Sequence, residues 1–110
     1  MKEIEKKFTI QPYNFTCFVI ITDNIIESRK KRNKILSESE LLEEPKGLHC
    51  DAGTLNSYVF IKYNSLSDTI SHEAYHVVCK LMKDIGAKHE EEIIAYTLGY
   101  IVRKIVLKST

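Results

Sequence analysis

The sequence predicts an α+β fold in one domain that spans residues 1–110. Short runs rich in β-branched and aromatic residues predict strands, and two long segments with apolar residues at helical spacing predict helices after them. With 110 residues, 44% of them hydrophobic, the chain is sufficient for one compact core and too short for two. We therefore expect a small mixed sheet covered by helices.

The N-terminal half contains one expected strand and one expected helix. Residues 15–22 are short, apolar and flanked by turn-forming residues, as in a buried central strand. Residues 25–44 follow Asp23, a favourable N-cap, and have a basic half and then an acidic half, so we expect a polar helix. Pro45 and Gly47 are expected to end this helix.

The C-terminal half is expected to form a hairpin and two longer helices. Residues 52–63 contain two extended runs, of which 58–63 is the stronger strand. A helix is expected over residues 65–86, because its final glycine is a common residue at the left-handed position that ends a helix. The last helix is expected from about residue 90 to about residue 108.

The charge balance argues against nucleic acid and membranes as partners. Sixteen basic residues are matched by fifteen acidic ones, and the basic run at 29–34 lacks interleaved aromatic residues, which is typical of a solvated helix face. The longest apolar run, 17–21, is too short to cross a bilayer, and the first residues lack the apolar stretch of a signal peptide. Three widely spaced cysteines favour a reducing compartment, so we expect the cytoplasm.

One motif carries recognisable chemistry, the sequence His-Glu-Ala-Tyr-His at residues 72–76. The spacing of four places His72 and His76 on one face of a helix, where both imidazoles can bind one Zn²⁺ ion, and Glu73 lies beside the open position of the metal. The two histidines point away from the apolar side of this helix, so they are not its core. A solvent-exposed histidine pair without metal is the alternative.

A zinc hydrolase needs a third protein ligand, and we expect Glu92, one of three consecutive glutamates, to supply it. Beside the apolar stripe of the last helix runs a second stripe formed by Glu92, Tyr96, Gly99 and Arg103. Because Gly99 has no side chain, the histidine helix could approach closely there. Alternatively, the three glutamates are only favourable charges at a helix N-terminus.

Residues 72–76, 85–89 and 92–100 resemble the small zincin-type peptidases that bacteriophages and prophages encode. The resemblance covers about the second half of the chain and implies a minimal zincin core with Zn²⁺ held by His72, His76 and Glu92. It also implies that Glu73 is the general base for a zinc-activated water that hydrolyses peptide bonds, in the host-cell cytoplasm if the protein is phage-encoded. The extended metzincin motif does not fit, since it requires Gly and His where Cys79 and Met82 stand.

Four further residues are candidates near such a site. Tyr96 could orient a ligand histidine through a hydrogen bond, while Tyr63, His49 or Arg103 could face the substrate. His49 and Cys50 together are weak evidence for a second metal site. Each of these residues is more often an ordinary packing or surface residue.

The expected substrate is an extended peptide or an unfolded protein. Residues 58–63 directly precede the metal helix, and we expect this strand to be the sheet edge to which a peptide pairs. The alternative function is a catalytically silent zincin-like module, either a binding module or a structural component of a virion. The sequence does not indicate an oligomeric state.

Overall fold

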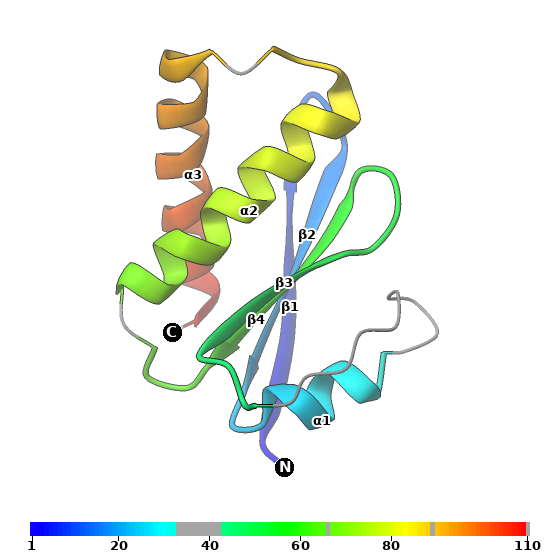
Figure 1. Cartoon of the computed structure of the whole chain (residues 1–110), viewed down its shortest axis with the longest axis vertical. Helices are drawn as coiled ribbons and strands as arrows, with labels where there is room; N and C mark the ends of the chain where they lie inside the picture. The colour runs from blue at the N-terminus through cyan, green and yellow to red at the C-terminus, as the bar shows by residue number, and fades with distance from the viewer. Residues whose placement is uncertain (33–42, 66, 89, 110) are drawn as a thin grey trace.

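The computed structural model describes residues 1–32, 43–65, 67–88 and 90–109, and every structural statement below concerns these residues. Four strands and three helices are present in this part of the chain (Figure 1). Their bounds are β1 (Glu3–Ile10), β2 (Phe15–Thr22), α1 (Ile25–Lys30), β3 (Gly47–Asp51), β4 (Asn56–Lys62), α2 (Ser67–Ile85) and α3 (Glu91–Ser109). The expected α+β class is confirmed.

The sheet is mixed and has the strand order β1-β2-β4-β3. Strand β2 pairs antiparallel with β1 and parallel with β4, while β3 pairs antiparallel with β4. The two inner strands are apolar along most of their length because both faces of each are covered. The expectation of a central strand at residues 15–22 is therefore confirmed, and the edges of the sheet are β1 and β3.

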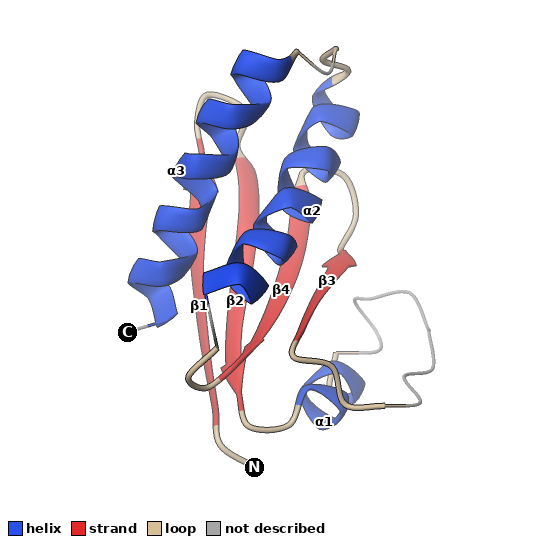
Figure 2. Cartoon of the chain, turned by 60° about the vertical axis from the view of Figure 1, so that its left-hand side comes forward, coloured by secondary structure: helices blue, strands red, loops and turns tan. Residues whose placement is uncertain are grey.

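Helices α2 and α3 cover one face of the sheet, as Figure 2 shows. Val19 of β2 and Val59 of β4 pack on this side against the apolar side chains of α2 and α3. Ile20 and Phe60, one residue further along the same strands, point to the opposite face and pack with Ile25 of α1. The main core therefore lies between the sheet and the two long helices.

No helix of the described residues is long and apolar enough to cross a membrane.

Three sequence-based element predictions need correction. Strand β1 was not expected, because half of its residues are charged and only alternate side chains near its end are buried. The helix expected over residues 25–44 ends at Lys30 in the structure, and residues 33–42 lie outside the described part. Strand β3 begins at Gly47, where that helix was expected to have just ended, so the hairpin starts earlier than predicted.

The expected end of the metal-motif helix is confirmed. Gly86 has a φ of 68°, a left-handed conformation that glycine adopts without a steric penalty. Its N–H donates to the carbonyl of Lys83 at 3.3 Å, and the N–H of Ala87 donates to the carbonyl of Met82 at 3.0 Å. These two bonds form a Schellman motif, which satisfies carbonyl groups that the helix leaves unpaired.

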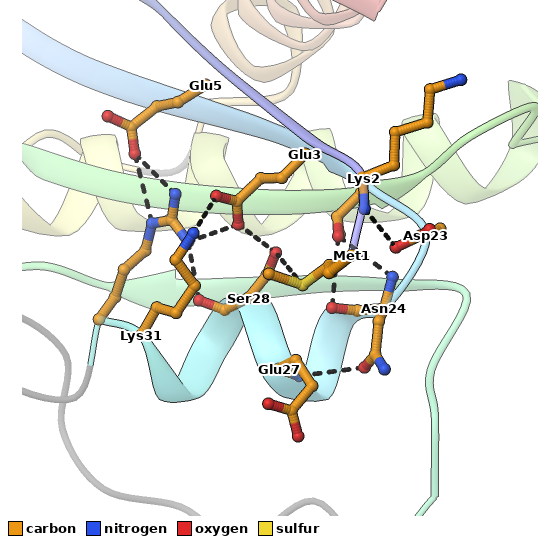
Figure 3. Close-up of polar contacts among 11 residues, drawn as sticks. Met1, Lys2, Glu3, Glu5, Asp23, Asn24, Glu27, Ser28 and Lys31 are labelled. Carbon is orange, nitrogen blue, oxygen red and sulfur yellow. Dashed lines mark hydrogen bonds and ion pairs between the residues drawn. The ribbon is translucent and has the colours of Figure 1, made fainter.

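Ion pairs connect β1 with the two residues that directly follow α1, on the face of the sheet opposite α2 (Figure 3). Glu3 of β1 pairs with Lys31 at 2.7 Å and with Arg32 at 2.9 Å, and it also accepts a hydrogen bond from Ser28. Arg32 pairs in addition with Glu5 at 3.0 Å. Because a six-residue helix buries little apolar surface, these charged contacts are a substantial part of what holds it.

Acid is expected to loosen this attachment. Burial alone would raise the pKa of Glu3, but hydrogen bonds from Arg32, Lys31 and Ser28 lower it from 4.5 to about 2. A lowered carboxyl pKa stabilises the folded state above pH 4.5, and this contribution is lost as the pH falls toward 2. The shift corresponds to at most about 3 kcal/mol, and solvent screening of the half-exposed Lys31 partner reduces this contribution. The free energy of unfolding of Glu3→Gln should therefore depend less on pH over this range than that of the wild type.

Chemical denaturation of both proteins between pH 5 and pH 2 measures this difference. Glu27→Gln is the matched control, because the side chain of Glu27 is 55% exposed and its ion pair among the described residues is a long one, with Lys30 at 3.7 Å. Its pH dependence should equal that of the wild type. Equal pH dependence in Glu3→Gln and the wild type would contradict the prediction.

Candidate metal centre

The motif residues His72, Glu73 and His76 lie together on α2. One potential ligand atom from each lies within 4.8 Å of the corresponding atoms of the other two. The Nε2 atoms of His72 and His76 are 3.3 Å apart, and the two rings meet edge to face with centroids 4.9 Å apart. Both histidines are exposed, whereas Glu73 is only 5% exposed. The expectation that the histidines avoid the core is confirmed.

The spacing of the two histidine nitrogens fits one zinc ion. With Zn–N bonds of about 2.0–2.1 Å and tetrahedral angles, two ligand nitrogens lie about 3.3–3.4 Å apart. The observed 3.3 Å agrees with this value. Imidazole nitrogen is a preferred donor for zinc, so both the type and the geometry of the donors suit this metal.

Glu73 is packed between α2 and the start of β3, and Gly47 makes the room for it. A Cβ atom added to Gly47 would lie 2.9 Å from Oε2 of Glu73 and 2.9 Å from Cγ2 of Thr69. A larger residue at this position would therefore have to displace the side chains of Glu73 and Thr69. Burial raises the pKa of the Glu73 carboxyl above its usual range, and the charge of His72 acts in the opposite direction.

An open pocket of about 550 Å³ adjoins this carboxylate. It lies between the beginning of β3 and the first turns of α2, and its lining includes the side chains of His72 and Glu73. The other lining residues are Lys46, Gly47, Asp68 and Thr69. A ligand in this pocket would touch the general-base candidate and one of the two metal-binding candidates.

His49 reaches the same cluster from β3. Its ring stacks on that of His76 with centroids 5.8 Å apart and an angle of 19° between the planes. Its Nε2 lies 2.9 Å from the hydroxyl oxygen of Ser57 on β4. Burial and the nearby charge of His76 lower the pKa of His49 to about 4, although Asp51 acts in the opposite direction. The imidazole of His49 is therefore neutral at pH 7.

The turn between β3 and β4 is held against α2 by a buried ion pair. Lys80 of α2 is 6% exposed, donates to the carbonyl of Gly53 at 2.9 Å and pairs with Asp84 one turn later. Asp84 in turn accepts a hydrogen bond from the backbone N–H of Leu55 at 2.8 Å. Both partners thus connect the helix to the turn, which fixes β3 and its His49 beside the histidines of α2.

The structure does not place Glu92 with the histidines. Glu92 is exposed in the first turn of α3, and Figure 2 shows that α3 begins at the end of the molecule where α2 finishes. His76 lies nine residues before the last residue of α2, a distance of about 13 Å along the helix axis. The group around His72 contains no residue of α3, so the expected third ligand is not found there.

The second stripe on α3, formed by Glu92, Tyr96, Gly99 and Arg103, does not face the histidine helix, so that prediction is wrong. Tyr96 is 78% exposed, and Arg103 is also exposed. A Cβ atom added to Gly99 would meet nothing within 4 Å, so no helix approaches there. The reason is that α3 packs through Ile101 and Ile105, which are fully buried, and this turns the second stripe toward solvent.

Tyr63 belongs to the core rather than to the site. It follows β4, packs against the main apolar cluster, and has the amine of Lys2 5.1 Å from its ring centroid. Its buried hydroxyl has no hydrogen-bond partner among the described residues. Tyr63 is not part of the pocket lining or of the His72 group.

The peptide-binding edge was also assigned to the wrong strand. Strand β4 is paired on both sides, with β2 and with β3, so its backbone groups are not available to a peptide. Among the strands that the structure describes, the outermost on this side of the sheet is β3. Side chains alternate along β3: Leu48 and Cys50 pack on the α1 side, while Gly47 and His49 face α2. This alternation is the sequence signal that could have identified residues 47–51 as a strand.

Comparisons with protein-family models, with curated proteins and with solved structures found no match to this chain. The functional argument therefore depends on the residues of the site.

Proposed function

We propose that this protein is a zinc-dependent peptidase whose metal is held by His72 and His76. The observation that carries the proposal is the 3.3 Å separation of the two Nε2 atoms, with a buried carboxylate from Glu73 beside them. A hydrogen bond between the two imidazoles would give the same spacing, but it would not account for the buried acid beside them. Structural zinc sites ordinarily have four protein ligands and catalytic sites have three, so a site with few protein ligands favours an enzyme over a structural site.

The division of roles follows from burial and position. Bound zinc would supply Lewis acidity, which polarises a carbonyl group and makes a water molecule a better nucleophile at neutral pH. His72 and His76 would hold the ion, since both are exposed on one helical face. Glu73 would take a proton from the attacking water and pass it to the leaving amine. Its pKa, raised by burial, makes this carboxylate a stronger base than an exposed one.

The proposed substrate is an extended peptide that pairs with the free edge of β3. Backbone hydrogen bonds to this edge would hold a peptide with little demand on its sequence. Because His49 stacks on His76 and Gly47 touches Glu73, a peptide along β3 would run past both parts of the site. Unfolded chains are therefore better substrates than folded domains. We also propose the cytoplasm as the compartment, in keeping with three free cysteines.

Removal and return of the metal tests the activity. Protein stripped with a chelator and protein reconstituted with one equivalent of Zn²⁺ are each incubated with a library of unfolded peptides, and products are identified by mass spectrometry. Cleavage should require zinc and should return when zinc is restored. Zinc-loaded protein that cleaves no peptide would favour the silent binding module, and equal cleavage without zinc would contradict the metal's role.

A further inference from the structure

We propose that His49 of β3 is the third protein ligand of the metal, so that the centre contains three histidines from two elements. The inference rests on the proposed zinc site and extends it to a residue outside the motif. Catalytic zinc sites ordinarily have three protein ligands. The group on α2 comprises His72, Glu73 and His76, and because the proposed function uses Glu73 as the general base, α2 supplies two of the ligands. The missing donor must therefore come from a neighbouring segment.

Other donors on α2 are badly placed to complete the site. Asp68 lies four residues before His72, and Cys79 lies three residues after His76. A helix rises about 5.4 Å per turn, so an ion midway between His72 and His76 is roughly one and a half turns away from either residue along the axis. Neither residue belongs to the group of potential ligand atoms around His72. A third ligand on another element is required.

His49 is the side chain that meets this requirement among the described residues. Its ring already stacks on that of His76, with centroids 5.8 Å apart, whereas Glu92 lies near the far end of α2. It is outside the group whose ligand atoms are within 4.8 Å of one another. Binding must therefore turn the His49 ring toward the pair. The ring centroids of His49 and His76 are 5.8 Å apart, so the movement required is small.

The surroundings of His49 are those of a metal-binding histidine. Ligand histidines usually use their second ring nitrogen in a hydrogen bond, which fixes the tautomer and the orientation of the ring. In His49 the hydroxyl of the fully buried Ser57 is 2.9 Å from Nε2, which leaves Nδ1 for the metal. The ion pair of Lys80 and Asp84 fixes the adjacent turn, so β3 presents His49 to α2 in a defined position.

Two measurements test this assignment. In the wild type, the ring nitrogens of the histidines are followed by NMR while Zn²⁺ is added. The resonances of His49, assigned by comparison with His49→Ala, should shift together with those of His72 and His76 and stop shifting at one equivalent.

Zinc affinity is then measured by competition with a chromophoric chelator. His49→Ala should bind more than 100-fold more weakly, because loss of a direct ligand should exceed the 10–100-fold effect of losing an outer hydrogen bond.

Matched variants separate ligation from a general effect on the strand. Ser57→Ala should weaken zinc binding by about 10–100-fold, and Cys50→Ala, on the opposite face of β3, should leave it unchanged. If the wild type binds one zinc while the His49 resonances do not move, or if His49→Ala keeps wild-type affinity, the assignment is overturned and the proposed function stands. If the wild type binds no zinc, the proposed function fails as well.

Discussion

Replacing Glu73 with glutamine is expected to abolish peptide hydrolysis while the fold and zinc binding persist. The amide has almost the shape of the carboxyl group, so it fits the space that Gly47 leaves beside α2. It cannot accept the proton of an attacking water, and the loss of a general base typically costs on the order of 10²–10⁴ in rate. Because burial raises the pKa of Glu73, the folded protein disfavours the charged form, and a neutral amide should not lower stability at pH 7.

Rates of hydrolysis of one cleavable peptide, measured at equal zinc occupancy, test this expectation. Glu91→Gln is the control, since Glu91 is exposed at the start of α3 and belongs to no part of the site. It should cleave at the wild-type rate. If Glu73→Gln is as active as the wild type, Glu73 is not the base. If Glu73→Gln loses its zinc together with its activity, Glu73 contributes to metal binding, and the loss of activity is not evidence for a general base.

The largest effect on stability is expected from Lys80→Met. Lys80 and Asp84 are 6% and 9% exposed, and removal of one member of a buried ion pair leaves the other charge without compensation. Burial would raise the pKa of Asp84, but the hydrogen bonds from Lys80 and from the backbone of Leu55 lower it below its usual value. Lys80→Met removes the first of these bonds, so the burial of the carboxylate then opposes its charge. We expect the free energy of unfolding to fall by about 3–5 kcal/mol.

Urea denaturation of three proteins measures this loss and its cause. The double variant Lys80→Met with Asp84→Asn removes both charges and keeps an acceptor for the N–H of Leu55. It should be more stable than Lys80→Met alone, because no charge remains buried without a partner. A loss below about 1 kcal/mol in the single variant would show that the pair behaves like an exposed one.

The elements of this fold that could be predicted from sequence are those whose patterns are complete within one segment. Strand β2 is apolar on both faces, and the apolar stripe of α3 ends in two fully buried isoleucines, so both were identified. Gly86 marked the end of α2 for a local reason, its left-handed φ. Strand β1 was missed because it is an edge strand, and the charged Glu3 that makes it look polar is what binds α1.

Only the part of the site that lies on one helix could be predicted from the sequence. The spacing of His72 and His76 fixes their common face, because both belong to the same helix. Glu92 was inferred from a stripe on α3, but a stripe does not reveal which of its sides faces the neighbouring helix. His49 was a candidate site residue, but its proximity to His76 was not predicted. That proximity depends on the antiparallel pairing of β3 with β4. Long-range pairing of this kind has no local signature.

Zinc content is the most direct measurement of the central claim. Protein purified without chelator, dialysed against Zn²⁺ and then freed of excess metal should contain one zinc per chain by elemental analysis. The double variant His72→Ala with His76→Ala should contain none, while Glu92→Gln should keep its zinc because Glu92 is remote from the histidines. A wild type without zinc, or a double variant with unchanged zinc content, would contradict the account.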